Sequence, residues 1–109
     1  MDLDFIKWMV GYAEGFILGV DDSVIFCHQT WELPRSLKFV EDWELYPLLL
    51  QRAIEGINNS ENYDIVQTRS NIVIYGYYKN PEPVYFELEP KLSDQAKEAA
   101  LKYIYEQEI

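Results

Sequence analysis

The sequence contains few of the residues that build covalent, metal and nucleotide sites. It has one cysteine, Cys27, and one histidine, His28, in 109 residues. A lone cysteine cannot form an internal disulfide, which is typical of proteins in a reducing compartment such as the cytoplasm. A structural zinc site needs several convergent cysteine or histidine ligands, so the sequence excludes one. We therefore expect neither a metal nor a cofactor.

Basic residues are also scarce. Nine Lys and Arg stand against 19 Asp and Glu, which gives a net charge of −10, and the acids are spread over both halves of the chain. Nucleic acids and anionic membrane surfaces attract clustered Lys and Arg, so the sequence predicts no direct binding to nucleic acid and none to a membrane. A charge of this size serves solubility or favours a protein partner with a basic surface.

Long apolar runs are absent as well. No run approaches the length of a transmembrane helix, and the start of the chain, 1–4, is acidic where a signal peptide would be basic. Structure-breaking residues are dense only in 79–83, which is too short to link two domains. With 49% hydrophobic and 16% aromatic residues the chain can bury one core, so we expect a single cytoplasmic domain spanning 1–109.

Three segments carry apolar residues at helical spacing. The predicted helices run from Asp2 or Asp4 to Gly15, from Trp43 to Asn58, and from Ser93 onward. Pro47 fits the second helix only in its first turn, where the missing N–H would have no intrahelical partner. In that helix apolar residues recur every four positions, which predicts burial against a sheet.

The remaining apolar segments have the alternation or the flanking turns of strands. The predicted strands are Phe16–Val20, Ser23–Trp31, Tyr63–Arg69, Ile72–Tyr78 and Val84–Leu88. We therefore expect an α+β fold with an antiparallel sheet of about five strands and three helices, in the order α-β-β-α-β-β-β-α. The expected core consists of Leu49, Ala53, Ile57, Ile65, Ile72, Ile74, Phe86, Leu88, Ala100 and Ile104.

The sequence does not bring together the residues of a catalytic site. Cys27 and His28 are adjacent on the predicted strand 23–31, so their side chains would point to opposite faces and could not act on one substrate. We interpret Cys27 as a buried apolar residue and His28 as a hydrogen-bonded or solvated side chain. Glycine-rich phosphate loops and nucleophile-elbow motifs are absent. We therefore expect no enzyme, with a small hydrolase that uses paired carboxylates as an alternative.

Aromatic residues are the most informative feature for binding. If one sheet face packs on the helices, alternation places tyrosines and carboxylates on the other. This candidate protein-binding surface consists of Trp31, Tyr75, Tyr77, Tyr85, Glu87 and Glu89. A helix that covers the face would make the tyrosines part of the core, whereas an exposed face would suit a basic protein. The sequence favours a non-enzymatic, acidic protein-binding module.

Two other functions are compatible with the same composition. A symmetric homodimer could form through the aromatic sheet face. A DNA mimic, in which carboxylates replace phosphates, needs dense rows of acids. The best such row is Glu82, Glu87, Glu89 and Asp94, and Lys91 interrupts it. The charge pattern therefore favours a general acidic and aromatic contact surface over DNA mimicry.

Two segments also carry a resemblance to known proteins. Residues 46–58 (YPLLLQRAIEGIN) and the Ala-rich 94–107 (DQAKEAALKYIYEQ) are similar to small bacteriophage and prophage proteins described as α-β-α sandwiches. The resemblance implies a virus-encoded accessory protein that acts on a host protein in the cytoplasm of a bacterial cell. It implies no catalytic residues.

Overall fold

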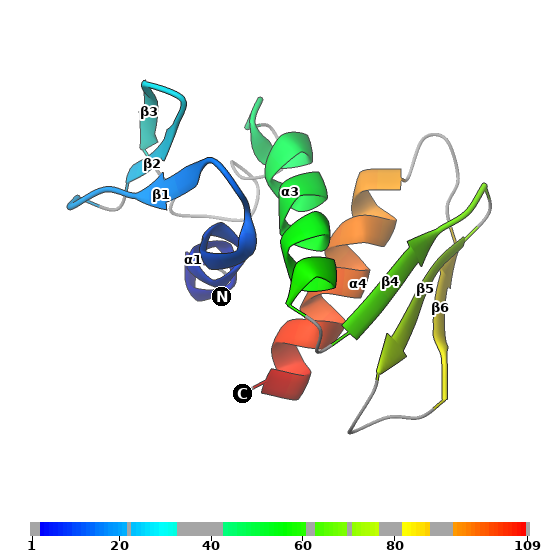
Figure 1. Ribbon diagram of the computed structural model, residues 1–109. Helices are drawn as coiled ribbons and strands as arrows, with labels where there is room; N and C mark the ends of the chain where they lie inside the picture. The colour runs from blue at the N-terminus through cyan, green and yellow to red at the C-terminus, as the bar shows by residue number, and fades with distance from the viewer. Residues whose placement is uncertain are drawn as a thin grey trace.

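The secondary structure twice repeats a helix followed by three strands, and a last helix follows (Figure 1). The computed structural model describes residues 3–21, 23–32, 43–60, 63–69, 71–76, 82–87 and 93–108. The elements in chain order are α1 (Leu3–Tyr12), β1 (Phe16–Leu18), β2 (Ser23–Phe26), β3 (Gln29–Glu32), α3 (Tyr46–Asn59), β4 (Tyr63–Gln67), β5 (Asn71–Gly76), β6 (Val84–Glu87) and α4 (Ser93–Glu108).

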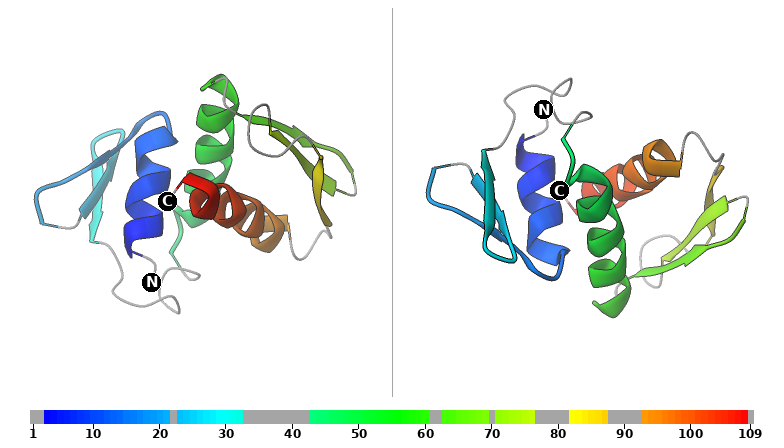
Figure 2. Two further views of the ribbon diagram at one scale, coloured as in Figure 1. Left: turned by 90° about the horizontal axis from the view of Figure 1, so that it is seen from below. Right: turned by 90° about the horizontal axis from the view of Figure 1, so that it is seen from above.

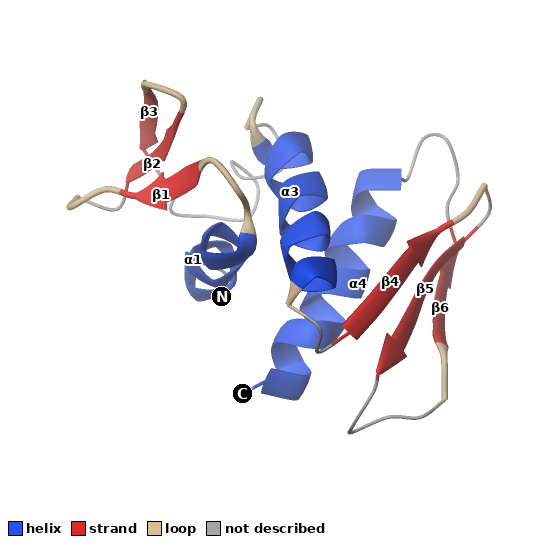
Figure 3. Ribbon diagram, viewed as in Figure 1, coloured by secondary structure: helices blue, strands red, loops and turns tan. Residues whose placement is uncertain are grey.

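The described strands form two separate antiparallel sheets, in the orders β1-β2-β3 and β4-β5-β6. The helices lie between the sheets: α1 contacts the first sheet through β1, whereas α3 and α4 contact the second (Figure 2). Colouring by secondary structure makes the layer order of sheet, helices, sheet visible (Figure 3). The α+β class is confirmed, but the predicted single sheet of about five strands is wrong. The layer order also differs from the α-β-α order that the resemblance implies.

The additional strand comes from a turn inside the predicted strand 23–31. Cys27 and His28 have positive φ angles of 47° and 76°, and Phe26 pairs directly with Gln29. Two residues with positive φ between paired strands make a tight hairpin of the type whose twist matches that of the strands. The segment therefore folds back as β2 and β3, and the described elements follow the order α-β-β-β-α-β-β-β-α.

The beginning and end of α3 show how local sequence fixes this helix. Pro47 lies in the first turn, as predicted, where its missing N–H costs no intrahelical bond. In the last turn of the helix, the Asn58 side chain exchanges hydrogen bonds with the backbone N–H and C=O of Ile65. This pairing fixes the start of the second sheet beside the end of α3.

The core lies between the two sheets and takes residues from each of the helices α1, α3 and α4. The predicted core residues in the described part of the chain are buried or packed against it, with Phe86 half-buried. Leu88 lies outside the described residues, as does Asp2 of the predicted helix start. The α1 helix adds Phe5, Ile6, Met9 and Val10 to the buried set. No described helix is both long and apolar enough to cross a membrane.

Candidate functional site

The side of the second sheet that faces away from the helices is the candidate site, and we call it the outer face. Its central row is formed by Val66, Val73 and Tyr85, which are direct cross-strand partners in β4, β5 and β6. Asp64 and Tyr75 form a neighbouring cross-strand pair on the same face. Directly paired residues of an antiparallel sheet share one face, so these five side chains lie together.

The outer face is apolar and open. Val66, Tyr75 and Tyr85 are 40%, 42% and 61% exposed, whereas Val73 on the central strand is buried. The helices that contact this sheet, α3 and α4, lie on its opposite side (Figure 1), where Ile72 and Ile74 are buried. Of the two interpretations that the sequence left open, the described residues therefore fit the one in which no helix covers the tyrosines.

The residues of the predicted binding surface do not all lie in the same sheet. Tyr75 and Tyr85 lie on the outer face as expected. Placing Trp31 with them is wrong: it lies in β3 of the other sheet, opposite Val24, and packs against the core. Trp31 therefore lies beside Val24 in the first sheet, and the helices separate it from the outer face of the second sheet.

The other predicted surface residues are only partly placed. Tyr77 and Glu89 lie outside the described residues. Glu87 ends β6 opposite Asn71, with only its backbone described. Sequence reasoning missed Asp64, Val66 and Val73, although the alternation of buried Ile65 with Asp64 and Val66 was a usable signal.

A second cluster joins the first helix to the last. The indole N–H of Trp8 donates to Glu108 Oε2 at 2.7 Å, and the Tyr12 hydroxyl donates to Glu108 Oε1 at 3.0 Å. Burial, and then this hydrogen bond and the charge of Glu108, raise the pKa of Tyr12. Burial and the same carboxylate also raise the pKa of Tyr63. Both phenols therefore stay protonated near neutral pH, and the hydrogen bonds to Glu108 link α1 to α4.

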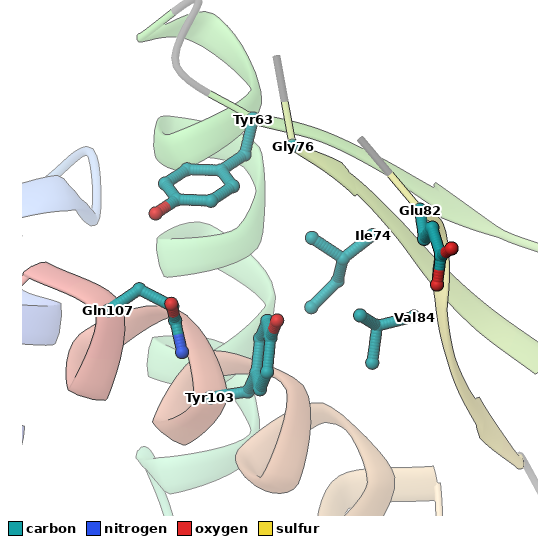
Figure 4. Close-up of a pocket in the computed structure, with 7 residues that line it drawn as sticks. All are labelled: Tyr63, Ile74, Gly76, Glu82, Val84, Tyr103 and Gln107. Carbon is teal, nitrogen blue, oxygen red and sulfur yellow. The ribbon is translucent and has the colours of Figure 1, made fainter. Parts of the chain in front are cut away.

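A small pocket lies between the second sheet and α4. Figure 4 shows the rings of Tyr63 and Tyr103 on one side, with Ile74 and Val84 of the sheet opposite. Gly76, Glu82 and Gln107 complete the lining. Its volume of about 10 Å³ admits roughly one water molecule. Pockets for small-molecule ligands are typically about 300–1,000 Å³, so this one is too small to bind a substrate in the observed conformation.

The chain's only cysteine and histidine lie at an exposed turn. Cys27 and His28 occupy the two turn positions between β2 and β3, and both are exposed. The interpretation of Cys27 as a buried apolar residue is therefore wrong, because the strand that was to bury it ends one residue earlier. Among the described residues, no three His, Cys, Asp or Glu side chains converge as metal ligands would.

Comparisons with known proteins give no further guide. No protein-family model, no curated protein and no solved structure matches the chain.

Proposed function

We propose that this chain is a non-enzymatic protein-binding module whose outer face contacts a basic protein. The observation that carries the proposal is the exposure of Val66, Tyr75 and Tyr85, which surround the buried Val73 on a sheet face that no described helix covers. Tyrosine is enriched in interface centres, where it combines a large apolar area with a polar tip at low conformational cost.

Charge supports the choice of a basic partner. The chain has a net charge of −10, and Asp64 lies beside Tyr75 on the outer face. An acidic surface accelerates the approach of a basic protein and repels acidic ones. Binding should therefore weaken as the salt concentration rises, because exposed charges are screened.

The cellular setting is part of the proposal. The resemblance of 46–58 and 94–107 to small bacteriophage proteins supports an accessory protein that binds a host protein in the bacterial cytoplasm. The expected partner is therefore a bacterial protein with a basic surface.

Affinity capture with a matched set of variants tests the proposal. Wild type, Tyr85→Ser and the control Gln29→Ala, an exposed residue of the other sheet, are each immobilised and exposed to bacterial lysate. A basic protein retained by wild type and control, lost with Tyr85→Ser and released by salt, would support the proposal. Equal retention by all three, or no specific retention, would count against it.

A homodimer through the same face is the second candidate. Apolar side chains as open as those of Val66, Tyr75 and Tyr85 can be buried in a symmetric contact. The net charge of −10 opposes that contact, because two copies repel each other. Light scattering over a range of concentrations distinguishes the candidates: a dimer that Tyr85→Ser dissociates would favour self-association, and a monomer throughout would exclude it.

A further inference from the structure

The first sheet has an exposed apolar edge. In the described part of the chain β1 is an edge strand, with only β2 beside it. Ile17 and Leu18 of β1 are 59% and 44% exposed, and Val20 in the following turn is fully exposed. Natural edge strands are commonly protected by short length, lysine, proline or a bulge, because open backbone groups invite another strand. With three residues β1 is short, but residues 16–20 (FILGV) contain no lysine and no proline.

The hydrogen-bond register shows which backbone groups point outward. The N–H of Gly19 donates to the Ser23 carbonyl at 2.8 Å, so Gly19 and Ser23 are a hydrogen-bonded pair. Such pairs alternate with non-hydrogen-bonded pairs along an antiparallel ladder. The next pair, Leu18 with Val24, is therefore of the second kind. The N–H and C=O of Leu18 point away from β2, toward the open edge.

Contacts with β2 and with the end of α1 hold β1 in place. The ring of Phe16 stacks on that of Phe26 with centroids 4.6 Å apart, and Phe16 is buried. The N–H of Phe16 donates to the Ala13 carbonyl at 3.2 Å, which ties β1 to the end of α1. The strand is thus ordered before any partner arrives, which lowers the entropic cost of binding.

The chain segment that contains β1 is acidic, and the nearest cation that the structure shows is Arg52 of α3, whose guanidinium lies 5.9 Å from the ring centroid of Phe26 in β2. Between Lys7 and Arg35 the chain contains no lysine or arginine. Glu14 precedes β1 in the chain and Asp21 follows it, and both side chains are exposed. An extended segment that pairs with β1 would thus meet a carboxylate near each end.

We propose that β1 binds an extended peptide segment of another protein by strand addition, through the outward backbone groups of Leu18. The segment carries apolar side chains at alternate positions, to contact Ile17 and Leu18, and lysine or arginine near its ends. In strand addition the backbone bonds supply affinity and the alternate side chains supply specificity. This surface lies on the other sheet from the outer face, so the inference does not rest on the proposed function.

A second copy of the chain is a poor occupant of the same edge. Antiparallel pairing of two β1 strands centred on Leu18 would bring Glu14 of each copy beside Asp21 of the other. Like charges placed opposite each other destabilise a strand pair. The charge pattern therefore selects a basic peptide over self-pairing.

Synthetic peptides of defined chemistry test the inference. The probe is a short fluorescent peptide of alternating valine and threonine with lysines at both ends. One comparison peptide has glutamate in place of the lysines, and another is N-methylated at alternate backbone nitrogens. Binding to the full chain is measured by fluorescence anisotropy, and the contact is located by amide chemical shifts. The protein variants are Leu18→Lys and Thr30→Lys, which introduce the same charge at the two opposite edges of the first sheet.

Strand addition predicts a distinct set of results. The lysine peptide should bind about tenfold more tightly than either comparison peptide, with shift changes in residues 16–20. Leu18→Lys should weaken binding about tenfold, and Thr30→Lys less than about twofold. Absence of binding, equal binding of the N-methylated peptide, or shift changes at Tyr75 and Tyr85 instead would overturn the inference. A dimer of the free protein that Leu18→Lys dissociates would overturn it in favour of self-pairing.

Discussion

The indole N–H of Trp8 and the carboxylate of Glu108 are joined by a 2.7 Å hydrogen bond, although 100 positions separate them in the sequence. The Tyr12 hydroxyl donates to the same carboxylate. The rings of Phe5, Trp8 and Tyr105 pack beside this contact, with centroids 5.3 to 6.0 Å apart. One carboxylate thus links the first helix of the chain to its last.

Removing that carboxylate should weaken the fold. Glu108→Ala removes the acceptor of both Trp8 and Tyr12, so we expect the free energy of unfolding to fall by about 1–2 kcal/mol. The control is Glu106→Ala, an exposed residue of the same helix, which should change it by less than about 0.5 kcal/mol. Urea denaturation measures both, and equal effects would show that the hydrogen bonds contribute nothing.

Stability should also fall at alkaline pH. The pKa values of Tyr12 and Tyr63 are raised above their ordinary value of about 10, chiefly by burial and then by Glu108. Above pH 10 the unfolded chain therefore releases these protons more readily than the folded chain, and the free energy of unfolding decreases as pH rises.

Two substitutions separate this effect from the loss of a hydrogen bond. Tyr12→Phe should lower stability at neutral pH but reduce the decline above pH 10, because one of the shifted phenols is gone. Trp8→Phe also loses a bond to Glu108 yet keeps both phenols, so its decline should match that of wild type. Urea denaturation between pH 8 and 11 compares them, and equal declines in all three proteins would contradict the assignment.

Two helical glycines should respond oppositely to alanine. A Cβ at Gly56 of α3 would overlap the backbone carbonyl of Tyr12, so α1 and α3 approach closely there. Gly56→Ala should lower the free energy of unfolding by about 1–3 kcal/mol, despite the better helix propensity of alanine. At Gly11 of α1 a Cβ would meet nothing within 4 Å, so Gly11→Ala should stabilise by about 0.5–1 kcal/mol. Thermal unfolding gives the signs, and stabilisation by Gly56→Ala would refute the close approach.

The β2–β3 turn is a site for stabilisation. Cys27 and His28 both hold positive φ, which Asn and Gly adopt at lower cost. Replacing the pair by Asn-Gly should raise the free energy of unfolding by about 1 kcal/mol or more. Changing the adjacent exposed Gln29 to Asn serves as the control and should have little effect. A melting temperature that does not rise with Asn-Gly would show that the turn is unstrained.

This turn also marks where sequence reasoning stopped being sufficient. The helix beginning at Tyr46 could be predicted because Pro47 and the four-residue apolar spacing act locally. Neither Cys27 nor His28 is a common turn residue, so nothing local signalled the break between β2 and β3. Cross-strand pairing, including Trp31 opposite Val24, selects that conformation.

The candidate site could likewise be predicted only in part from the sequence. Alternation within one strand predicted that Tyr75 and Tyr85 lie opposite the helices, because the period of two is a local property. It could not predict which strands share a sheet, since that depends on where the helices pack. Trp31 was misplaced for this reason, and Val73 was missed because its exposure depends on neighbours from two other strands.

The position of α4 has a consequence for protein synthesis. This helix contributes Leu101 and Ile104 to the core and packs on β5 and β6, yet it follows all of its partners in the chain. A ribosome therefore releases the second sheet before the helix that covers part of its apolar side. During that interval Ile72 and Ile74 are incompletely covered, and the nascent chain is open to chaperones and to aggregation. Translation of 93–108 sets the moment at which the core closes, and a pause just before it would prolong the vulnerable state.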